Sequence, residues 1–328
     1  MSKHIHAVTI GDINGIGIKI LLDIWKKNNK ILGSFILVTN IQIINKFLKK
    51  NKYKIKINKI NYLQNILKIK SNCINIYDFN TKNNYTNSYE SLIYSHELCK
   101  KNICSSIITL PVNKEKISKF VNKKFVGQTE FFQKKDNKDI SNMIFYYKKI
   151  IVTTLTNHIP FKLINEKLKY KKHIIKKILL LKNTLKIDFN IKSPKILISG
   201  LNPHAGENSL IGKEEKKIII PIIKELRKRK VLIDGPHSAD SLFIKKNINK
   251  YNCFICLYHD QALIPFKLIS DFKGVNYTGS LDIIRTSPDH GTAYKLNIKD
   301  AKKDSLLNSF ILAKKIYLNR KRYQIAKT

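Results

Sequence analysis

The sequence has no apolar run as long as the about 18 residues that a membrane-spanning helix needs. A short polar start leads directly into an apolar run at residues 7–10, so we expect no signal peptide, no membrane association and a cytoplasmic location. The five cysteines are an odd number, which argues against a disulfide framework. Cys253 and Cys256 form a Cys-x-x-Cys pair inside an apolar run, and no second pair accompanies them. We therefore interpret both as thiols of the core rather than as zinc ligands.

Acidic residues are scarce: 23 Asp and Glu stand against 62 Lys and Arg, and the formal net charge is +39. Such a charge raises the hypothesis of nucleic-acid binding, and residues 49–70 interleave lysines with Tyr53 and Tyr62. However, lysines are spread along the whole chain, and few of the basic residues are arginine, which is preferred for phosphates and base edges. We interpret the excess of Lys, Asn and Ile as compositional drift and do not expect nucleic acid as the main partner. The charge can still attract an anionic substrate.

Alternating strand-like and helix-like segments predict an α/β protein with mostly parallel sheets. The 328 residues are enough for two lobes around a cleft, and we find no internal repeat. We expect a solvated, lysine-rich helix at residues 165–185, short edge strands and loops at 52–76, and a loop at 234–240. Other strands are expected at residues 7–10, 35–38, 106–109, 150–155, 195–199 and 253–258, and other helices at 41–50, 89–102 and 214–230.

Three of the apolar runs end in polar segments that contain a histidine. Residues 150–155 lead to His158, residues 195–199 to His204, and residues 253–258 to His259. In open α/β sheets, ligands bind beyond the carboxyl ends of the strands. Neutral imidazole is the commonest metal ligand, and three protein ligands with one open position are typical of catalytic metal sites. The pattern is compatible with one shared metal site and with three separate structural histidines.

Four further features have two interpretations each. The glycine-rich turn at residues 11–17 can bind an anion through its amides or can simply be a tight turn between strand and helix. Lys114 can face a cleft or begin a helix. Asp240 can be a further metal ligand or can orient one of the histidines. Arg285, one of the few arginines, carries a fork that suits a carboxylate or a phosphate.

Three motifs are fairly specific: Asn-Pro-His-Ala-Gly-Glu at 202–207, Tyr-His-Asp-Gln at 258–261 and Asp-His-Gly-Thr-Ala at 289–293. They stand in a distinctive order with further stretches at residues 11–17, 111–115, 127–132, 158–160, 240–243 and 274–276. In these stretches the sequence resembles the 4-hydroxythreonine-4-phosphate dehydrogenase family of vitamin B6 synthesis, over nearly the whole chain. The resemblance implies a two-lobed α/β/α fold like that of isocitrate and isopropylmalate dehydrogenases. The first lobe would comprise residues 1–125 and 287–328, and the second, residues 126–286, would carry the metal and substrate residues beside the cleft. It also implies a homodimer whose second subunit contributes to the active site.

The resemblance also implies roles for individual residues. One divalent metal ion, Zn, Mg or Co, would be bound by His158, His204 and His259. The nicotinamide cofactor, NAD or NADP, would contact Asp289, His290, Gly291, Thr292 and Ala293. Catalytic roles fall to Lys267 and Asp260, with proton transfer by Lys267 or by a bound water left open. The substrate would be bound by Gln128, Thr129, Lys267, Asn276 and Arg285.

The implied reaction is metal-dependent, NAD(P)-linked oxidation and decarboxylation of 4-phosphohydroxy-L-threonine to 3-amino-2-oxopropyl phosphate and CO2, in pyridoxal 5'-phosphate biosynthesis. Gln128 stands where the family usually has histidine, and it cannot carry a proton. Asp282 stands where the family usually has proline, and its charge could weaken anion binding at Arg285. In the first turn Ile13, Asn14 and Lys19 replace the usual Pro, Ala and Glu. Two alternatives remain: a sibling dehydrogenase acting on threonate or erythronate phosphate, and a basic nucleic-acid-binding protein on a decayed enzyme scaffold.

Overall fold

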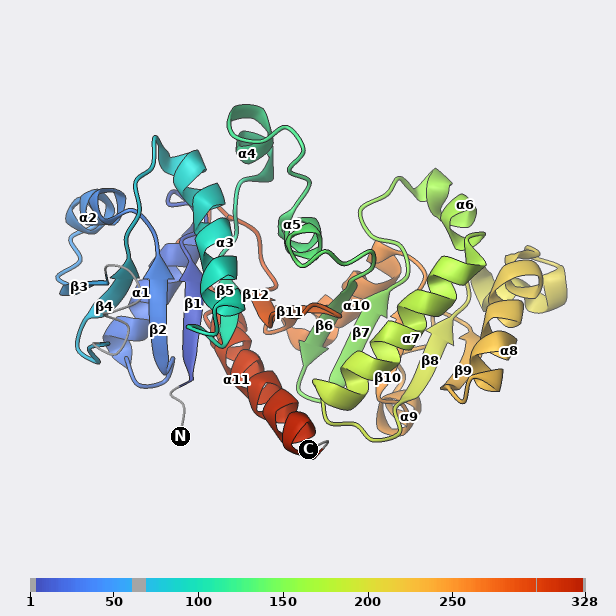
Figure 1. Ribbon diagram of the computed structural model, residues 1–328. Coiled ribbons are helices and arrows are strands. Elements are labelled where there is room, and N and C mark those ends of the chain that lie inside the picture. The colour runs from blue at the N-terminus through green and yellow to red at the C-terminus, as the bar shows by residue number, and fades with distance from the viewer. Residues whose placement is uncertain (1–3, 61–68, 299, 327–328) are drawn as a thin grey trace. The chain divides into compact units, whose positions relative to one another are not determined.

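The computed structural model describes residues 4–60, 69–298 and 300–326 (Figure 1). Within it the chain forms two compact units, Met1–Asp139 with Leu281–Leu318, and Ile140–Ser280 with Asn319–Thr328. The boundaries of the lobes implied by the resemblance, at 125/126 and 286/287, differ from these. Gln128, Thr129 and Arg285 belong to the first unit, whereas the three histidines belong to the second.

Among the described residues, the first unit contains six parallel strands in the order β3-β4-β2-β1-β5-β12. The expected edge strands within residues 52–76 are present as β3 and β4, and residues 61–68 of that stretch lie outside the described residues. Helix α3 packs on β1 and β5 (Figure 1). The strands are β1 (Ile5–Thr9), β2 (Ser34–Val38), β3 (Ile57–Ile60), β4 (Ile74–Tyr77), β5 (Ser106–Thr109) and β12 (Arg285–Pro288). The helices are α1 (Ile16–Lys27), α2 (Ile41–Lys50), α3 (Asn84–Lys100), α4 (Lys114–Phe120), α5 (Gln128–Lys135) and α11 (Asp304–Ile325). The last residues of α11 belong to the second unit.

The second unit has the strand order β11-β6-β7-β10-β8-β9, in which β6 alone runs antiparallel to its neighbours. Helix α7 packs against β6 and α8 (Figure 1). The strands are β6 (Asn142–Tyr147), β7 (Ile150–Thr154), β8 (Lys195–Ser199), β9 (Leu232–His237), β10 (Cys253–Cys256) and β11 (Val275–Gly279). The α-helices are α6 (Ile164–Leu168), α7 (Lys171–Ile187), α8 (Ile220–Lys228), α9 (Lys245–Lys250) and α10 (His259–Ser270). Other helical segments are η2 (Phe161–Leu163), η3 (Pro203–Ser209) and η4 (Glu215–Ile219).

The α/β class and the mostly parallel sheets are confirmed, and two local predictions are wrong. Residues 234–240 were expected to form a loop, but β9 continues to His237. The strand tolerates Pro236 because β9 is the last strand of its sheet, where a missing amide leaves no ladder bond unmade. The helix expected at residues 165–185 is divided into α6 and α7, and α7 is not simply a solvated face because Lys177 on it is buried.

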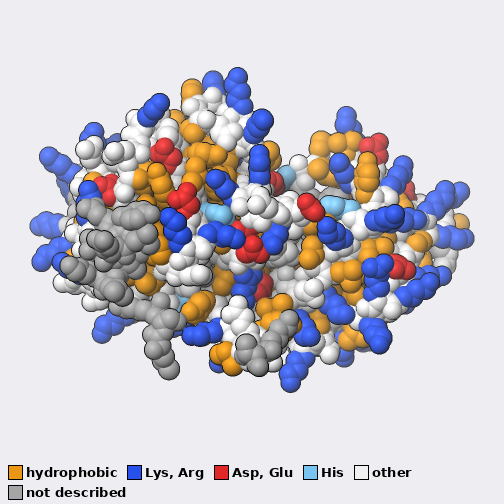
Figure 2. Space-filling view, viewed as in Figure 1, with side chains coloured by type: hydrophobic (Ala, Val, Ile, Leu, Met, Phe, Trp, Pro, Cys, Tyr) orange, Lys and Arg blue, Asp and Glu red, His pale blue; other side chains and the backbone are white. Residues whose placement is uncertain are grey.

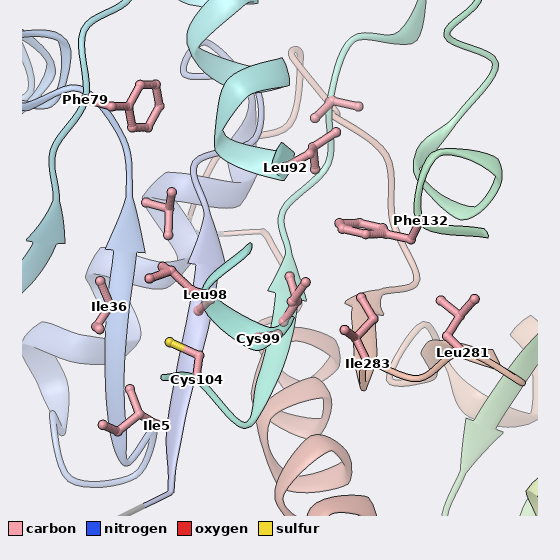
Figure 3. Close-up of a cluster of buried hydrophobic side chains, with 14 of the residues drawn as sticks. Ile5, Ile36, Phe79, Leu92, Leu98, Cys99, Cys104, Phe132, Leu281 and Ile283 are labelled. Atoms are coloured by element: carbon pink, nitrogen blue, oxygen red, sulfur yellow. The ribbon is translucent and has the colours of Figure 1, made fainter. Parts of the chain in front are cut away.

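Each unit has its own apolar core. In the first unit, side chains from distant parts of the sequence pack together, among them Ile36, Leu92, Phe132 and Leu281 (Figure 3). In the second unit the core includes Cys256, which is fully buried, like Cys253 beside it. Burial raises the pKa of both thiols, so the interpretation of the Cys-x-x-Cys pair as core residues is confirmed.

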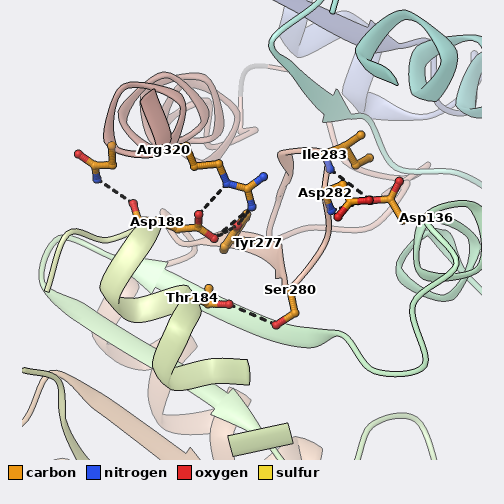
Figure 4. A network of polar contacts seen from close by, with 9 residues as sticks. Asp136, Thr184, Asp188, Tyr277, Ser280, Asp282, Ile283 and Arg320 are labelled. Atoms are coloured by element: carbon orange, nitrogen blue, oxygen red, sulfur yellow. Dashed lines mark hydrogen bonds and ion pairs between the residues drawn. The ribbon is translucent and has the colours of Figure 1, made fainter. Parts of the chain in front are cut away.

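A buried polar cluster attaches the end of α11 to the second unit (Figure 4). Arg320 donates from Nε to Asp188 Oδ1 at 2.7 Å, and the hydroxyl of Tyr277 donates to the other carboxylate oxygen of Asp188. Asn319 donates to the backbone carbonyl of Asp188 at 2.7 Å. Because Asp188 is 2% exposed, its charge depends on these partners rather than on water.

Lysine and arginine side chains are scattered over the face of the molecule seen in Figure 2, with acidic and apolar side chains between them, and form no single stripe. On this face the basic side chains therefore do not form the stripe that is expected of a nucleic-acid surface. Among the described residues, no helix is both long and apolar enough to cross a bilayer.

The Asp188 cluster predicts the effect of Arg320→Leu. The substitution leaves a buried carboxylate without its cation, so we expect the free energy of unfolding to fall by about 3–5 kcal/mol. The control is Arg322→Leu, an exposed position on the same helix, which should change it by no more than about 0.5 kcal/mol. Urea unfolding measures both, and equal small losses would show that the cluster does not stabilise the protein.

Candidate active site

The three histidines follow three neighbouring strands. His158, His259 and His204 come after β7, β10 and β8, which lie side by side in that order and run parallel. Their carboxyl ends therefore meet at one edge of the sheet, where ligands bind in open α/β folds. The chain order of the strands does not reveal this adjacency, because β10 is inserted between β7 and β8.

Two of the histidines lie together. The ring centroids of His158 and His259 are 5.7 Å apart, and both rings line a pocket of about 250 Å³. His259 Nδ1 donates to the carboxylate of Asp260 at 2.6 Å, which leaves Nε2 as the nitrogen that can bind a metal. The pocket is lined by Thr156, His158, Ile159, Phe161, Ile164, Tyr258, His259 and Asp260.

His204 is exposed on η3, a turn in which residues 204–208 all have left-handed backbone angles. The turn is held from inside by the buried carboxylate of Glu215, which accepts hydrogen bonds from the amides of Leu201 and Asn202 at 2.7 and 2.8 Å. Asp240, also exposed, lies within electrostatic range of His204; its pKa is lowered mainly by a hydrogen bond from Ser238 and slightly by His204.

Within the described residues, no group of three His, Cys, Asp or Glu side chains is placed to hold one metal ion. The structure thus brings together His158 and His259, and it places His204 on η3, the segment that follows the neighbouring strand β8. Three imidazoles are a donor set that suits a divalent metal such as zinc or cobalt. The set fits a metal ion in its chemistry and in the position of two of its three members.

Lys267 and Asn276 lie on other elements of the second unit. Lys267 is on α10, two turns beyond His259, with its ammonium 5.3 Å from the ring centre of Phe272. Asn276 is on β11, and its buried Oδ1 has no hydrogen-bond partner among the described residues. A buried acceptor without a donor is costly, so this oxygen is suited to receive one from a ligand.

In the first unit, Arg285 is the centre of a buried polar cluster. Its guanidinium donates to Thr109 Oγ1 at 2.9 Å, to Thr129 Oγ1 at 3.4 Å and to Gln128 Oε1 at 2.5 Å. The side chain is 2% exposed, and burial lowers its pKa to about 10, against an opposing effect of Glu130. Arg285 therefore remains a cation near neutral pH, and these three acceptors are uncharged. Such a cation can bind an anion strongly.

Gln128 and Asp282 each have a defined local role. Gln128 donates from Nε2 to the carbonyl of Leu110 at 2.9 Å, which directs Oε1 toward Arg285. Asp282 is paired with Lys138 at 2.7 Å and Lys100 at 3.3 Å, so its charge is largely neutralised. Its amide donates to Asp136 Oδ2 at 2.8 Å, a bond that a proline could not make (Figure 4). We therefore expect Asp282 to weaken anion binding at Arg285 only slightly.

The glycine-rich turn uses its amides internally. The amides of Asp12 and Gly15 donate to Pro111 and Asp12, and that of Ile16 donates to the carbonyl of Thr292 at 2.9 Å. This favours the tight-turn interpretation over an anion site. The same bond fixes the segment at residues 289–293, and the amide of Asp289 donates to Ser305 Oγ at 2.8 Å. Lys114 is exposed at the first position of α4, as its helix-start interpretation requires.

Lys177 was not predicted to be buried, but it is 6% exposed and donates to the carbonyl of Leu155 at 2.8 Å. Leu155 directly follows β7 and precedes the segment that carries His158. The helical spacing of Ile174, Lys177, Ile178 and Leu181 is that of one buried face, so this signal was present in the sequence but hidden among many lysines.

Comparisons with known proteins cover both units. The family model of the pyridoxal phosphate biosynthetic protein PdxA matches residues 25–313. A curated 4-hydroxythreonine-4-phosphate dehydrogenase from Zymomonas mobilis is 34% identical over 334 residues, 97% of each chain. Another, from Sulfurihydrogenibium sp., is 34% identical over 305 residues, 90% of this chain and 93% of its own. The crystal structure of 4-hydroxythreonine-4-phosphate dehydrogenase from Klebsiella pneumoniae is 28% identical with a TM-score of 0.83, over 96% of this chain and 100% of that chain.

Burial lowers the pKa of Lys177 to about 8, below its ordinary 10.5, and this predicts a dependence of stability on pH. Between these two values the unfolded chain binds more protons than the folded one, so stability rises with pH. Relative to Lys177→Met, we expect the free energy of unfolding of the wild type to increase by about 3 kcal/mol from pH 8 to 10.5. Lys176→Met, at an exposed neighbouring position, should show no such trend. A difference between wild type and Lys177→Met that is constant with pH would contradict the prediction.

The Arg285 cluster predicts that Gln128→Glu impairs anion binding without unfolding the protein. The new carboxylate pairs with Arg285, which offsets the lost bond to Leu110 and adds a negative charge that competes with an anion for Arg285. We expect the dissociation constant for inorganic phosphate to rise at least about tenfold, which corresponds to 1.4 kcal/mol, with little change in melting temperature. Gln133→Glu on the same helix is the control. Calorimetric titration that finds equal affinity in all three proteins would exclude Arg285 as the anion site.

Proposed function

The chain belongs to the family of the pyridoxal phosphate biosynthetic protein PdxA, and on this premise we propose that it oxidises and decarboxylates 4-phosphohydroxy-L-threonine to 3-amino-2-oxopropyl phosphate and CO2. NAD+ or NADP+ accepts the hydride, and the reaction serves pyridoxal 5'-phosphate biosynthesis. The assignment of the site rests on one observation. The three histidines lie on the segments that follow three adjacent parallel strands, and the rings of two of them line the same pocket.

We assign His158, His204 and His259 as the ligands of a divalent metal ion, with zinc or cobalt preferred over magnesium because imidazole nitrogen suits these metals better. A bound metal ion of this kind supplies Lewis-acid stabilisation of negative charge on oxygen. Asp260 acts through His259, since its hydrogen bond to Nδ1 fixes the ring and its tautomer. In this assignment Asp260 is a positioning residue.

The phosphate or carboxylate of the substrate is bound by Arg285, whose planar fork is oriented by Thr109, Thr129 and Gln128. Asn276 accepts a hydrogen bond from the substrate through Oδ1, which has no other donor in the described chain. Asp289 to Ala293 contact the nicotinamide cofactor, on a segment that is already fixed by Ile16 and Ser305. Hydride transfer requires loss of the hydroxyl proton, and a bound water, or Lys267 in its neutral amine form, accepts it.

The position of Lys267 supports a homodimer. Eight residues of helix separate it from His259 by about 12 Å along the axis, and it does not line the pocket that His259 lines. Near it, Ile264 and Leu268 on α10 and Phe272, two residues beyond the helix, form an exposed apolar stripe; they are 70%, 82% and 48% exposed. An apolar stripe of this kind is typical of a protein interface. We propose that a second copy of the chain covers it and that Lys267 serves the partner's site.

The proposal is tested by following reduction of NAD+ and of NADP+ by the purified protein with 4-phosphohydroxy-L-threonine, with and without a chelator. We expect turnover that the chelator abolishes and that His204→Ala lowers at least about 100-fold. His173→Ala, an exposed histidine on α7, should retain full activity.

Two results would contradict the proposal in different ways. Turnover that is unaffected by the chelator would remove the metal assignment. A folded, metal-loaded dimer that does not turn over this substrate, but does oxidise the 4-phosphate of threonate or erythronate, would establish the sibling activity, and Gln128→His would then test whether the missing histidine sets that preference.

A further inference from the structure

The side chain of Gln261 joins the ends of two strands in the second unit. Its Oε1 accepts hydrogen bonds from Ser199 Oγ and from the amide of Leu257, both at 2.7 Å. Its Nε2 donates to the carbonyl of Gly200 at 2.9 Å. Ser199 ends β8, Gly200 follows it, and Leu257 follows β10. One amide thus makes three hydrogen bonds to two chain segments that are about 60 residues apart in sequence.

These bonds continue the sheet where its ladder stops. The register of β8 and β10 pairs Ile198 with Ile255 and goes no further. Gly200 and Leu257 beyond it are buried, so their backbone groups need partners inside the protein. A side-chain amide offers a donor and an acceptor a short distance apart, as a peptide group does. Gln261 therefore takes the place of the missing backbone partner on both strands.

The two segments that Gln261 joins lead to two of the three histidines. His259 stands two residues before Gln261, and His204 stands four residues after Gly200. On the other side of β10, Thr156 joins β7 to Leu257 through its hydroxyl and its amide, at 2.7 and 3.1 Å. The segments that follow all three strands are therefore linked to one another by hydrogen bonds near Leu257.

We propose that Gln261 is a positioning residue of the histidine site, which sets the spacing between the segments that carry His204 and His259. This inference rests on the proposed metal-binding function and adds a residue to it. Gln261 touches neither metal nor substrate in this role. Its contribution is to restrict the separation of two ligands, so its loss lowers metal affinity rather than removing a ligand.

The test is binding of Co2+ alone, followed by its visible absorption, to the full-length wild type, Gln261→Glu, Gln261→Met and the control Gln133→Met. Gln261→Glu keeps both acceptor contacts, loses the donor to Gly200 and places a carboxylate oxygen against that carbonyl instead. Gln261→Met loses all three bonds at similar volume. Gln133→Met removes a side-chain amide that also donates to a backbone carbonyl, that of Asp139, in the first unit.

We expect the dissociation constant for Co2+ to rise about 10- to 100-fold in Gln261→Met and by a smaller factor in Gln261→Glu, with an altered absorption spectrum and no change in Gln133→Met. A purely structural role would lower the melting temperature and leave affinity and spectrum unchanged, which would overturn the inference. If Gln261→Met does not fold, Gln261→Glu decides by the same criterion. Failure of the wild type to bind Co2+ would instead overturn the metal assignment itself, and the inference with it.

Discussion

The site depends on the parallel pairing of β7, β10 and β8, because this pairing brings three sequence-distant chain exits to one edge of a sheet. The backbone ladder ends just before those exits, and buried peptide groups beyond it need other partners. In each case a polar side chain supplies one. Lys177 binds the carbonyl of Leu155 after β7, Gln261 binds Gly200 and Leu257 between β8 and β10, and Glu215 binds the amides that follow Gly200. The histidines are thus carried by segments whose starting points are fixed.

The scarcity of acidic residues has a direct structural consequence. With 62 basic and 23 acidic side chains, most cations cannot find a carboxylate, and the buried ones show how the fold responds. Arg320 is paired with Asp188 and anchors a helix. Lys177 and Arg285 instead donate to uncharged oxygens, and burial lowers the pKa of both. Neutral acceptors hold a cation in place without neutralising it. The hydroxyl and amide oxygens orient the guanidinium of Arg285, whereas Arg320 donates directly to a carboxylate.

The sequence was sufficient for the fold class, the position of most strands and the three histidine exits, because apolar runs that end abruptly in polar residues are local signals. It could not reveal that β10 lies between β7 and β8, since strand order is a property of the whole sheet. It also misassigned Lys177, because in a chain so rich in lysine one buried member does not stand out by composition. The lobe boundary differs for a related reason: Gln128 donates to Leu110 and Arg285 donates to Thr109, so both residues belong with the end of β5 in the first unit, whereas the resemblance places both in the second lobe. The ligand set, the cofactor and the dimer remain predictions.

Gln128 shows how a departure from the family pattern can keep one function and lose another. A histidine can orient an arginine, and it can also gain or lose a proton near neutral pH. Glutamine can only orient: here the carbonyl of Leu110 holds its Nε2, so that its Oε1 meets Arg285. The positive charge of Arg285 itself does not change across the physiological pH range, since its pKa is still about 10 after burial. Under the proposed assignment, Gln128 and Arg285 contribute no titration near neutral pH, whereas a bound phosphate does, with its second ionisation at about pH 6. The substitution separates geometry, which the amide preserves, from proton transfer, which other groups have to supply.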